Sequence, residues 1–134
     1  MQVVVALVEA FTLMSVSRVC LAVFPVKRIV WAITRSTIKQ GTSETNFHPL
    51  PASAKTAIWA IKTVASRSAV KFVCFPQSIA GYWMLRRRNI ASTIVYGVRR
   101  DEDKLISHTW LKCGGKALIG EGQEHEFSVI AEWP

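Results

Sequence analysis

A change in hydrophobic periodicity near residue 90 constrains the fold of this chain more than any other feature. Before it, apolar residues recur at helical spacing, which predicts four helices: 2–24, 26–38, 54–66 and 75–88. After it, β-branched and aromatic residues follow a period of two, which predicts four strands: 91–99, 104–112, 116–119 and 126–131. Helices followed by consecutive short strands predict an α+β domain with an antiparallel sheet.

Turn and cap residues mark the ends of these segments. Pro25 ends the first helix, and Ser53 is a candidate N-cap for the third. Pro76 suits the first turn of the fourth helix, and Asn89 is suited to a left-handed residue after its end. Gly114-Gly115 predicts a hairpin turn. Between the second and third helices, 39–52 forms a polar loop rich in proline.

Composition narrows the class of protein further. A length of 134 residues suits one domain, which we divide into N-terminal helices and loop (1–52) and a core (53–134). Half of the residues are apolar, which excludes a disordered chain. Seventeen basic and nine acidic residues give a net charge of +8. The three cysteines are an odd number without a CxxC pair, so we expect free thiols in the reducing cytoplasm, and no metal or other cofactor.

The first helix is apolar enough to raise the question of a membrane span. It contains Glu9 and Arg18, and both charges would be costly inside a bilayer. No basic n-region or small-residue cleavage pattern indicates a signal peptide. We therefore expect a helix that packs into a core or against a partner, while peripheral contact of the basic chain with an anionic membrane stays open.

Two residues stand out as candidates for chemistry. Cys74 lies at the predicted start of the fourth helix, where free N–H groups and the helix dipole favour a thiolate nucleophile. His108 lies inside a strand, on the same face as Trp110, where a general base would be held rigidly. A buried structural cysteine and a structural histidine are the ordinary alternatives. The remaining cysteines and histidines have no such placement: Cys20, Cys113, His48 and His125.

The arginines of 86–88 and 99–100 could form a basic patch. Because cations near the C-terminus of a helix offset its dipole, we rank that explanation first for 86–88. Contact with an acidic partner ranks second. Nucleic-acid binding ranks last, since aromatic residues do not interleave with these arginines, and no nucleic acid is expected as a partner.

Several motifs, taken in order, resemble one known family. They are Cys-Phe at 74–75, Met-Leu-Arg-Arg-Arg-Asn-Ile at 84–90, Gly-Val at 97–98 and His-Thr-Trp at 108–110. Val-Glu-Ala at 8–10, Arg18 and Phe-Pro-Val-Lys-Arg at 24–28 extend the similarity over nearly the whole chain. In these features the chain resembles the B proteins of lasso peptide biosynthesis, which are leader peptidases of the transglutaminase-like cysteine protease superfamily.

The resemblance implies a transglutaminase/papain-like core in which Cys74 and His108 form a catalytic pair. The family's third member, an aspartate, would fall at Gly120, and Glu121 is its neighbour. A bend at Gly120 would let Glu121 orient His108; a backbone carbonyl or an amide side chain is the alternative. If the position is equivalent, Gly120→Asp would supply the family's carboxylate.

The resemblance also implies partners. The family occurs fused to a small leader-recognition domain or separate from it, and this chain resembles the separate form. It implies a precursor peptide with a leader, a separate leader-recognition protein and an ATP-dependent macrolactam cyclase. Two other functions stay open: a catalytically idle scaffold of the same fold, and a basic module that binds a membrane surface or nucleic acid.

Overall fold

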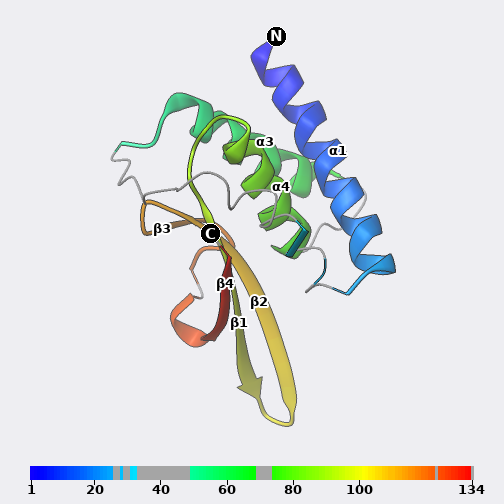
Figure 1. Ribbon diagram of the computed structural model, residues 1–134, viewed down its shortest axis with the longest axis vertical. Coiled ribbons are helices and arrows are strands. Elements are labelled where there is room, and N and C mark those ends of the chain that lie inside the picture. The colour runs from blue at the N-terminus through cyan, green and yellow to red at the C-terminus, as the bar shows by residue number, and fades with distance from the viewer. Residues whose placement is uncertain (26–27, 29–30, 33–48, 69–73, 123, 134) are drawn as a thin grey trace.

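Three helices pack on one side of a four-stranded antiparallel sheet in a computed structural model that describes residues 1–25, 28, 31–32, 49–68, 74–122 and 124–133 (Figure 1). The helices are α1 (Gln2–Val23), α3 (Ala52–Arg67) and α4 (Cys74–Arg86). The strands are β1 (Thr93–Asp101), β2 (Lys104–Cys113), β3 (Lys116–Ile119) and β4 (Ser128–Trp133), with a 3-10 turn η1 (Glu124–Glu126) before β4. The predicted α+β class is confirmed.

The strands lie in the order β3-β2-β1-β4, so the first three form a meander and β4 returns to pair with β1. Both glycines at 114–115 have positive φ (58° and 78°), which confirms the predicted tight turn between β2 and β3. The β1–β2 hairpin extends well beyond the helices (Figure 1).

Each face of β2 belongs to a different apolar cluster, as the period of two predicts. Leu111 and Cys113 face the helices and join the main core. Trp110 faces the other way and packs with Val95 of β1 and Phe127. His108 shares the face of Trp110 and therefore projects from the side of the sheet opposite the helices.

Most helix ends lie close to their predicted positions. Pro76 lies in the first turn of α4, and Asn89 has a φ of 56°, the left-handed conformation expected after the helix. The predicted cap at Ser53 is wrong: α3 begins at Ala52 after Pro51, without a side-chain cap. Proline at this boundary fixes φ near its helical value, so the helix starts without a hydroxyl cap. Most of the predicted helix 26–38 and most of the loop 39–52 lie outside the described residues.

α1 packs on α3 and α4 through a stripe of small and flexible side chains. The buried residues of this stripe follow helical spacing: Ala6, Ala10, Met14 and Ser17. By length and composition α1 would also pass as a membrane-spanning helix. Its packing on two other helices is compatible with a soluble protein.

Glu9 ties α1 to the end of α4. Its carboxylate accepts hydrogen bonds from Arg87 Nη1 at 3.1 Å and from Arg88 Nη2 at 3.0 Å, and its side chain is only 11% exposed. Arg88 Nη1 also donates to the carbonyl oxygen of Met84, 2.8 Å away, in the last turn of α4. The arginines therefore offset the C-terminal end of α4, as their position predicts, and they neutralise the acidic residue in the apolar helix.

We expect Glu9→Gln to lower the free energy of unfolding by about 2 kcal/mol, because two guanidinium groups lose a shared, largely buried carboxylate. Chemical denaturation monitored by circular dichroism measures the change. Glu102→Gln, at an exposed position in the β1–β2 turn, is the control and should shift stability by less than about 0.5 kcal/mol. Equal stability of the two variants would contradict this role of Glu9.

Candidate active site

Cys74 is the first residue of α4, at the helix start that the sequence predicts, and its side chain is half-buried. The position of α4 is fixed by its close approach to the sheet at Gly81. A Cβ atom at Gly81 would lie 2.6 Å from a side-chain carbon of Ile119 and 2.7 Å from one of Leu111. Only glycine lets the helix lie this close to β2 and β3.

His108 is held by a hydrogen bond and two aromatic rings. Its Nε2 atom lies 2.9 Å from the carbonyl oxygen of Gly120. The imidazole stacks on Trp110 with ring centroids 5.8 Å apart, and Phe127 lies against it at 5.3 Å. These three contacts restrict both the position and the tilt of the ring.

The partner of His108 defines its tautomer. A carbonyl oxygen can only accept a hydrogen bond, so Nε2 carries the proton and donates it. In the neutral imidazole, the free lone pair then lies on Nδ1. The bond to Gly120 therefore leaves Nδ1 as the nitrogen that can take a proton from a thiol.

Gly120 approaches His108 so closely that no other residue fits without rearrangement. Its φ is 72°, and a Cβ atom there would lie 2.7 Å from the carbonyl oxygen of Thr109 and 3.0 Å from Nε2 of His108. The expectation that Gly120→Asp supplies a catalytic carboxylate is therefore wrong for this backbone, because the new side chain would collide with β2. The chain bends at Gly120 as expected, and the bend presents a carbonyl group.

Glu121, the predicted orienting residue, lies elsewhere. Its carboxylate forms an ion pair with Lys62 of α3, and both side chains are about half exposed. Within the described part of the chain, no hydrogen bond joins Glu121 to His108. Of the two possibilities that the sequence left open, the structure favours the backbone carbonyl.

Glu124 lies in the turn that follows Gly120. Hydrogen bonds to its carboxylate lower the pKa of Glu124, first that from its own backbone N–H and then that from the N–H of Gly122. The Gly122 N–H donates to Glu124 Oε2 at 2.8 Å, which closes the turn after Gly120. Glu124 thus supports the turn that presents the Gly120 carbonyl.

We expect Glu121→Gln to change the rate of the peptide cleavage that the family resemblance implies by no more than about twofold, because the Lys62 ion pair is exposed and such pairs contribute little. Activity is measured as the initial rate of peptide cleavage, and thermal unfolding is followed in parallel. Lys62→Gln is the matched control, since it breaks the same pair from the other side. A loss of more than tenfold in Glu121→Gln alone would restore Glu121 as the orienting residue.

The structure packs α4 against the face of β2 opposite to the His108 side chain. Ser78, one turn after Cys74 on the same face of α4, has its Oγ 3.5 Å from the carbonyl oxygen of Thr109, the neighbour of His108. Within the described residues, no hydrogen bond joins Cys74 to His108, and His108 projects from the opposite face of the sheet. The structure therefore does not bring the predicted pair together, because α4 and the His108 side chain lie on opposite faces of the sheet.

The other cysteines and histidines are placed differently. Cys113 is buried and donates a hydrogen bond from Sγ to the carbonyl oxygen of Ala91, 3.2 Å away, and burial raises the pKa of its thiol. Cys20 lies on α1, away from the sheet. His125 is exposed in η1, and His48 lies outside the described residues. The described residues contain no group of three or more His, Cys, Asp or Glu side chains that could hold a metal ion.

Phe127 is the site residue that sequence reasoning missed. It lies in the segment predicted as the fourth strand, but it precedes β4 and packs against the imidazole. Its aromatic side chain next to an acidic segment was visible in the sequence, yet nothing there indicates which histidine it contacts. Only the pairing of β4 with β1, opposite β2, brings it to His108.

A family match extends over nearly the whole chain. Residues 6–132 match the family model described as the transglutaminase-like superfamily. No curated protein and no solved structure gives a significant match. The match covers most of α1, all of α3 and α4, and the sheet as far as Glu132, including Cys74, His108 and Gly120, so the chain belongs to the transglutaminase-like superfamily.

Proposed function

We propose that this protein is a cysteine peptidase that removes the leader from a ribosomally made lasso peptide precursor. The superfamily includes cysteine proteases, and it is supported here by the match over residues 6–132. The single observation that carries the proposal is the bond of His108 Nε2 to Gly120, which leaves Nδ1 free as a base. The motifs at 84–90 and 108–110 support the narrower assignment to lasso peptide maturation.

The first half of the reaction is the formation of a thioester. This reaction requires Cys74 to reach the face of the sheet on which His108 lies. There its thiol gives its proton to Nδ1 of His108, and the thiolate attacks the carbonyl carbon of the scissile amide. The resulting oxyanion is stabilised by backbone N–H groups at the start of α4, including that of Cys74. The C–N bond then breaks, and the proton on Nδ1 passes to the leaving amine, which is the N-terminus of the core peptide.

The second half is hydrolysis. Nδ1 of His108 accepts a proton from a water molecule, and the resulting hydroxide attacks the thioester carbonyl. The C–S bond breaks, the leader leaves as a carboxylic acid, and the proton returns to Cys74. The net change is one amide and one water converted into an acid and an amine. The Gly120 carbonyl holds Nε2–H throughout, which is the task that a carboxylate performs in the family.

The proposal includes partners and a location. A separate leader-recognition protein would deliver the precursor, an ATP-dependent macrolactam cyclase would close the ring, and the reaction would take place in the cytoplasm. The catalytically idle scaffold is the second candidate function. It is favoured by the absence of a hydrogen bond between Cys74 and His108 within the described residues.

We expect cleavage of the precursor by this chain alone to be slow, and the leader-recognition protein to raise the rate at least about tenfold, because tethering raises the effective concentration of the scissile bond. Mass spectrometry of the released core peptide measures the rate with and without the partner. A precursor with a scrambled leader is the control and should show no stimulation. Equal rates with and without the partner would contradict the separate-partner system, and no cleavage under any condition would favour the idle scaffold.

A further inference from the structure

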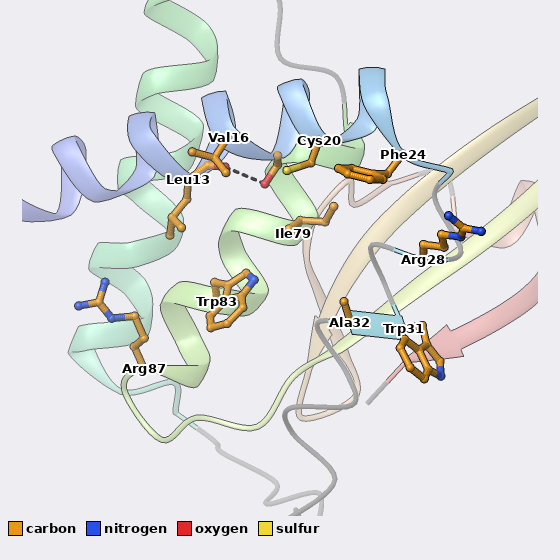
Figure 2. A pocket seen from close by; sticks show the side chains of 11 residues that line it. Leu13, Val16, Cys20, Phe24, Arg28, Trp31, Ala32, Ile79, Trp83 and Arg87 are labelled. Carbon is orange, nitrogen blue, oxygen red and sulfur yellow. Dashed lines mark hydrogen bonds between the residues drawn. The ribbon is translucent and has the colours of Figure 1, made fainter.

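An apolar groove of about 840 Å³ lies between α1, α4 and a third wall formed by Arg28, Trp31 and Ala32 (Figure 2). Its walls are aliphatic and aromatic side chains: Leu13, Val16, Cys20, Phe24, Ile79 and Trp83. Along α1 the groove extends from Leu13 to Phe24, a rise of about 16 Å or three helical turns. Arg87 lies toward one end and Arg28 toward the other, with Trp83 between them (Figure 2).

The groove is distinct from the candidate active site. Its residues on α4 and directly after it recur every four positions, at Ile79, Trp83 and Arg87. Ser78 and Gly81 lie on the other side of α4 and contact the sheet. Cys74 lies one turn before Ser78 on the same face of α4, so the helix separates the groove from Cys74.

The surface around the groove is both apolar and positive. Val16 and Phe24 are about half exposed, and Trp83 is 36% exposed. Large apolar side chains that gather on an exposed surface usually mark a contact site. Glu9 forms ion pairs with both Arg87 and Arg88, so the three side chains together carry a net charge of +1. Arg28 is exposed at the other end, in a chain with a net charge of +8.

These features identify the kind of occupant. A groove three helical turns long accepts the apolar ridge of a helix, and positive charge at both ends complements carboxylates. A bilayer presents no ridge that would enter a concave site. A second copy of this chain does not fit either, because the three described helices contain one acidic residue, Glu9, which is already paired.

We propose that the groove between α1 and α4 binds an amphipathic helix of a partner protein, with apolar anchors along one face and acidic residues toward both ends. The partner binds on the side of α4 away from Cys74, so this contact recruits the partner and leaves the catalytic edge open. The inference does not depend on the proposed peptidase activity.

The test uses the full-length Cys74→Ala protein and two synthetic helical peptides of about 15 residues. Both peptides carry leucines at i, i+3, i+4, i+7 and i+11; one has glutamates at its ends and the other has lysines. Cys20 lines the groove, so a bound peptide should protect its thiol from alkylation. Cys113, the other remaining cysteine, is buried and should not interfere. Alkylation of Cys20 is followed by mass spectrometry, and peptide affinity is measured by fluorescence anisotropy.

We expect the acidic peptide to slow Cys20 alkylation at least about tenfold and to bind more tightly than the basic peptide. Val16→Glu should weaken its binding at least about tenfold, since a charge would be buried in the contact. Val4→Glu is the matched control on the same helix: Val4 is 62% exposed and does not line the groove, and binding should stay within twofold. Arg28→Glu should shift the preference toward the basic peptide.

Four results would overturn the proposal. The first is that neither peptide protects Cys20, and the second is that both bind equally well. The third is protection by anionic phospholipid vesicles but not by the acidic peptide, which would assign the groove to a membrane. The fourth is a Cys20 thiol that resists alkylation in the free folded protein, which would mean that the groove is already filled. Circular dichroism confirms that each variant is folded.

Discussion

Cys74→Ala is expected to lower the rate of leader cleavage by at least about a thousandfold, while Cys20→Ala and Cys113→Ala stay within a fewfold of wild type. Loss of a covalent nucleophile removes the whole acyl-transfer route, which accounts for the size of the effect. Of the three cysteines, Cys74 is the one at the start of a helix. Cleavage is measured by mass spectrometry of the core peptide in the presence of the leader-recognition protein.

The two control variants separate chemistry from folding. Cys113 is buried with its thiol bonded to Ala91, and burial raises its pKa, so it stays protonated and unreactive at neutral pH. Cys113→Ala should therefore affect stability more than rate. If Cys113→Ala or Cys20→Ala abolished cleavage while Cys74→Ala did not, the assignment of the nucleophile would be wrong.

Gly120→Ala is expected to lower the cleavage rate on the order of a hundredfold, because the added methyl group must displace His108 or the backbone of β2, and small displacements of a catalytic base are costly. The matched control is Gly115→Ala. Gly115 has a similar φ of 78°, but its added methyl group meets no atom within 4 Å. Both substitutions strain the backbone, so only the contact with His108 distinguishes them.

Measurements of both rate and stability are needed to compare Gly120→Ala with Gly115→Ala. We expect similar losses of thermal stability in the two glycine variants and a loss of kcat in Gly120→Ala alone. Rates are compared at a temperature at which both proteins are fully folded. Equal activity of the two variants would show that the Gly120 carbonyl does not orient His108.

Local patterns predicted the fold well because they reflect local physics. The period-two segments became β1 to β4, and the two faces of β2 divided as the alternation predicts, with Leu111 toward the helices and Trp110 away from them. Asn89, Gly114 and Gly115 have the positive φ expected at the helix end and in the hairpin turn, because asparagine and glycine tolerate this conformation. The cap at Ser53 failed because proline at the previous turn set the helix start.

The candidate site was predictable only in part. Placement at the start of α4 singled out Cys74, since a proline follows within one turn. The partner of His108 was not predictable as a residue type, because a backbone carbonyl leaves no trace in the sequence. Glu121 was attractive by its position next to Gly120, but α3 provides Lys62 as its partner, a contact between residues 59 positions apart.

The apolar character of α1 also needed the structure for its interpretation. The sequence shows a helix that is apolar on nearly every side, with Glu9 as an exception. In the fold, the small residues are buried and the valines are exposed, so the outer face and the groove beside it remain available. The two arginines that neutralise Glu9 directly follow α4, 78 and 79 residues later in the chain.

The central claim is that Cys74 carries the leader as a thioester during cleavage. The most direct measurement is rapid acid quenching of the protein with precursor and leader-recognition protein, followed by digestion and mass spectrometry of the Cys74 peptide. The account predicts a Cys74 peptide heavier by the acyl mass of the leader, absent from His108→Ala and removed by hydroxylamine. Normal cleavage with no adduct on Cys74 at any quench time, or an adduct on Cys20 or Cys113 in its place, would contradict the account.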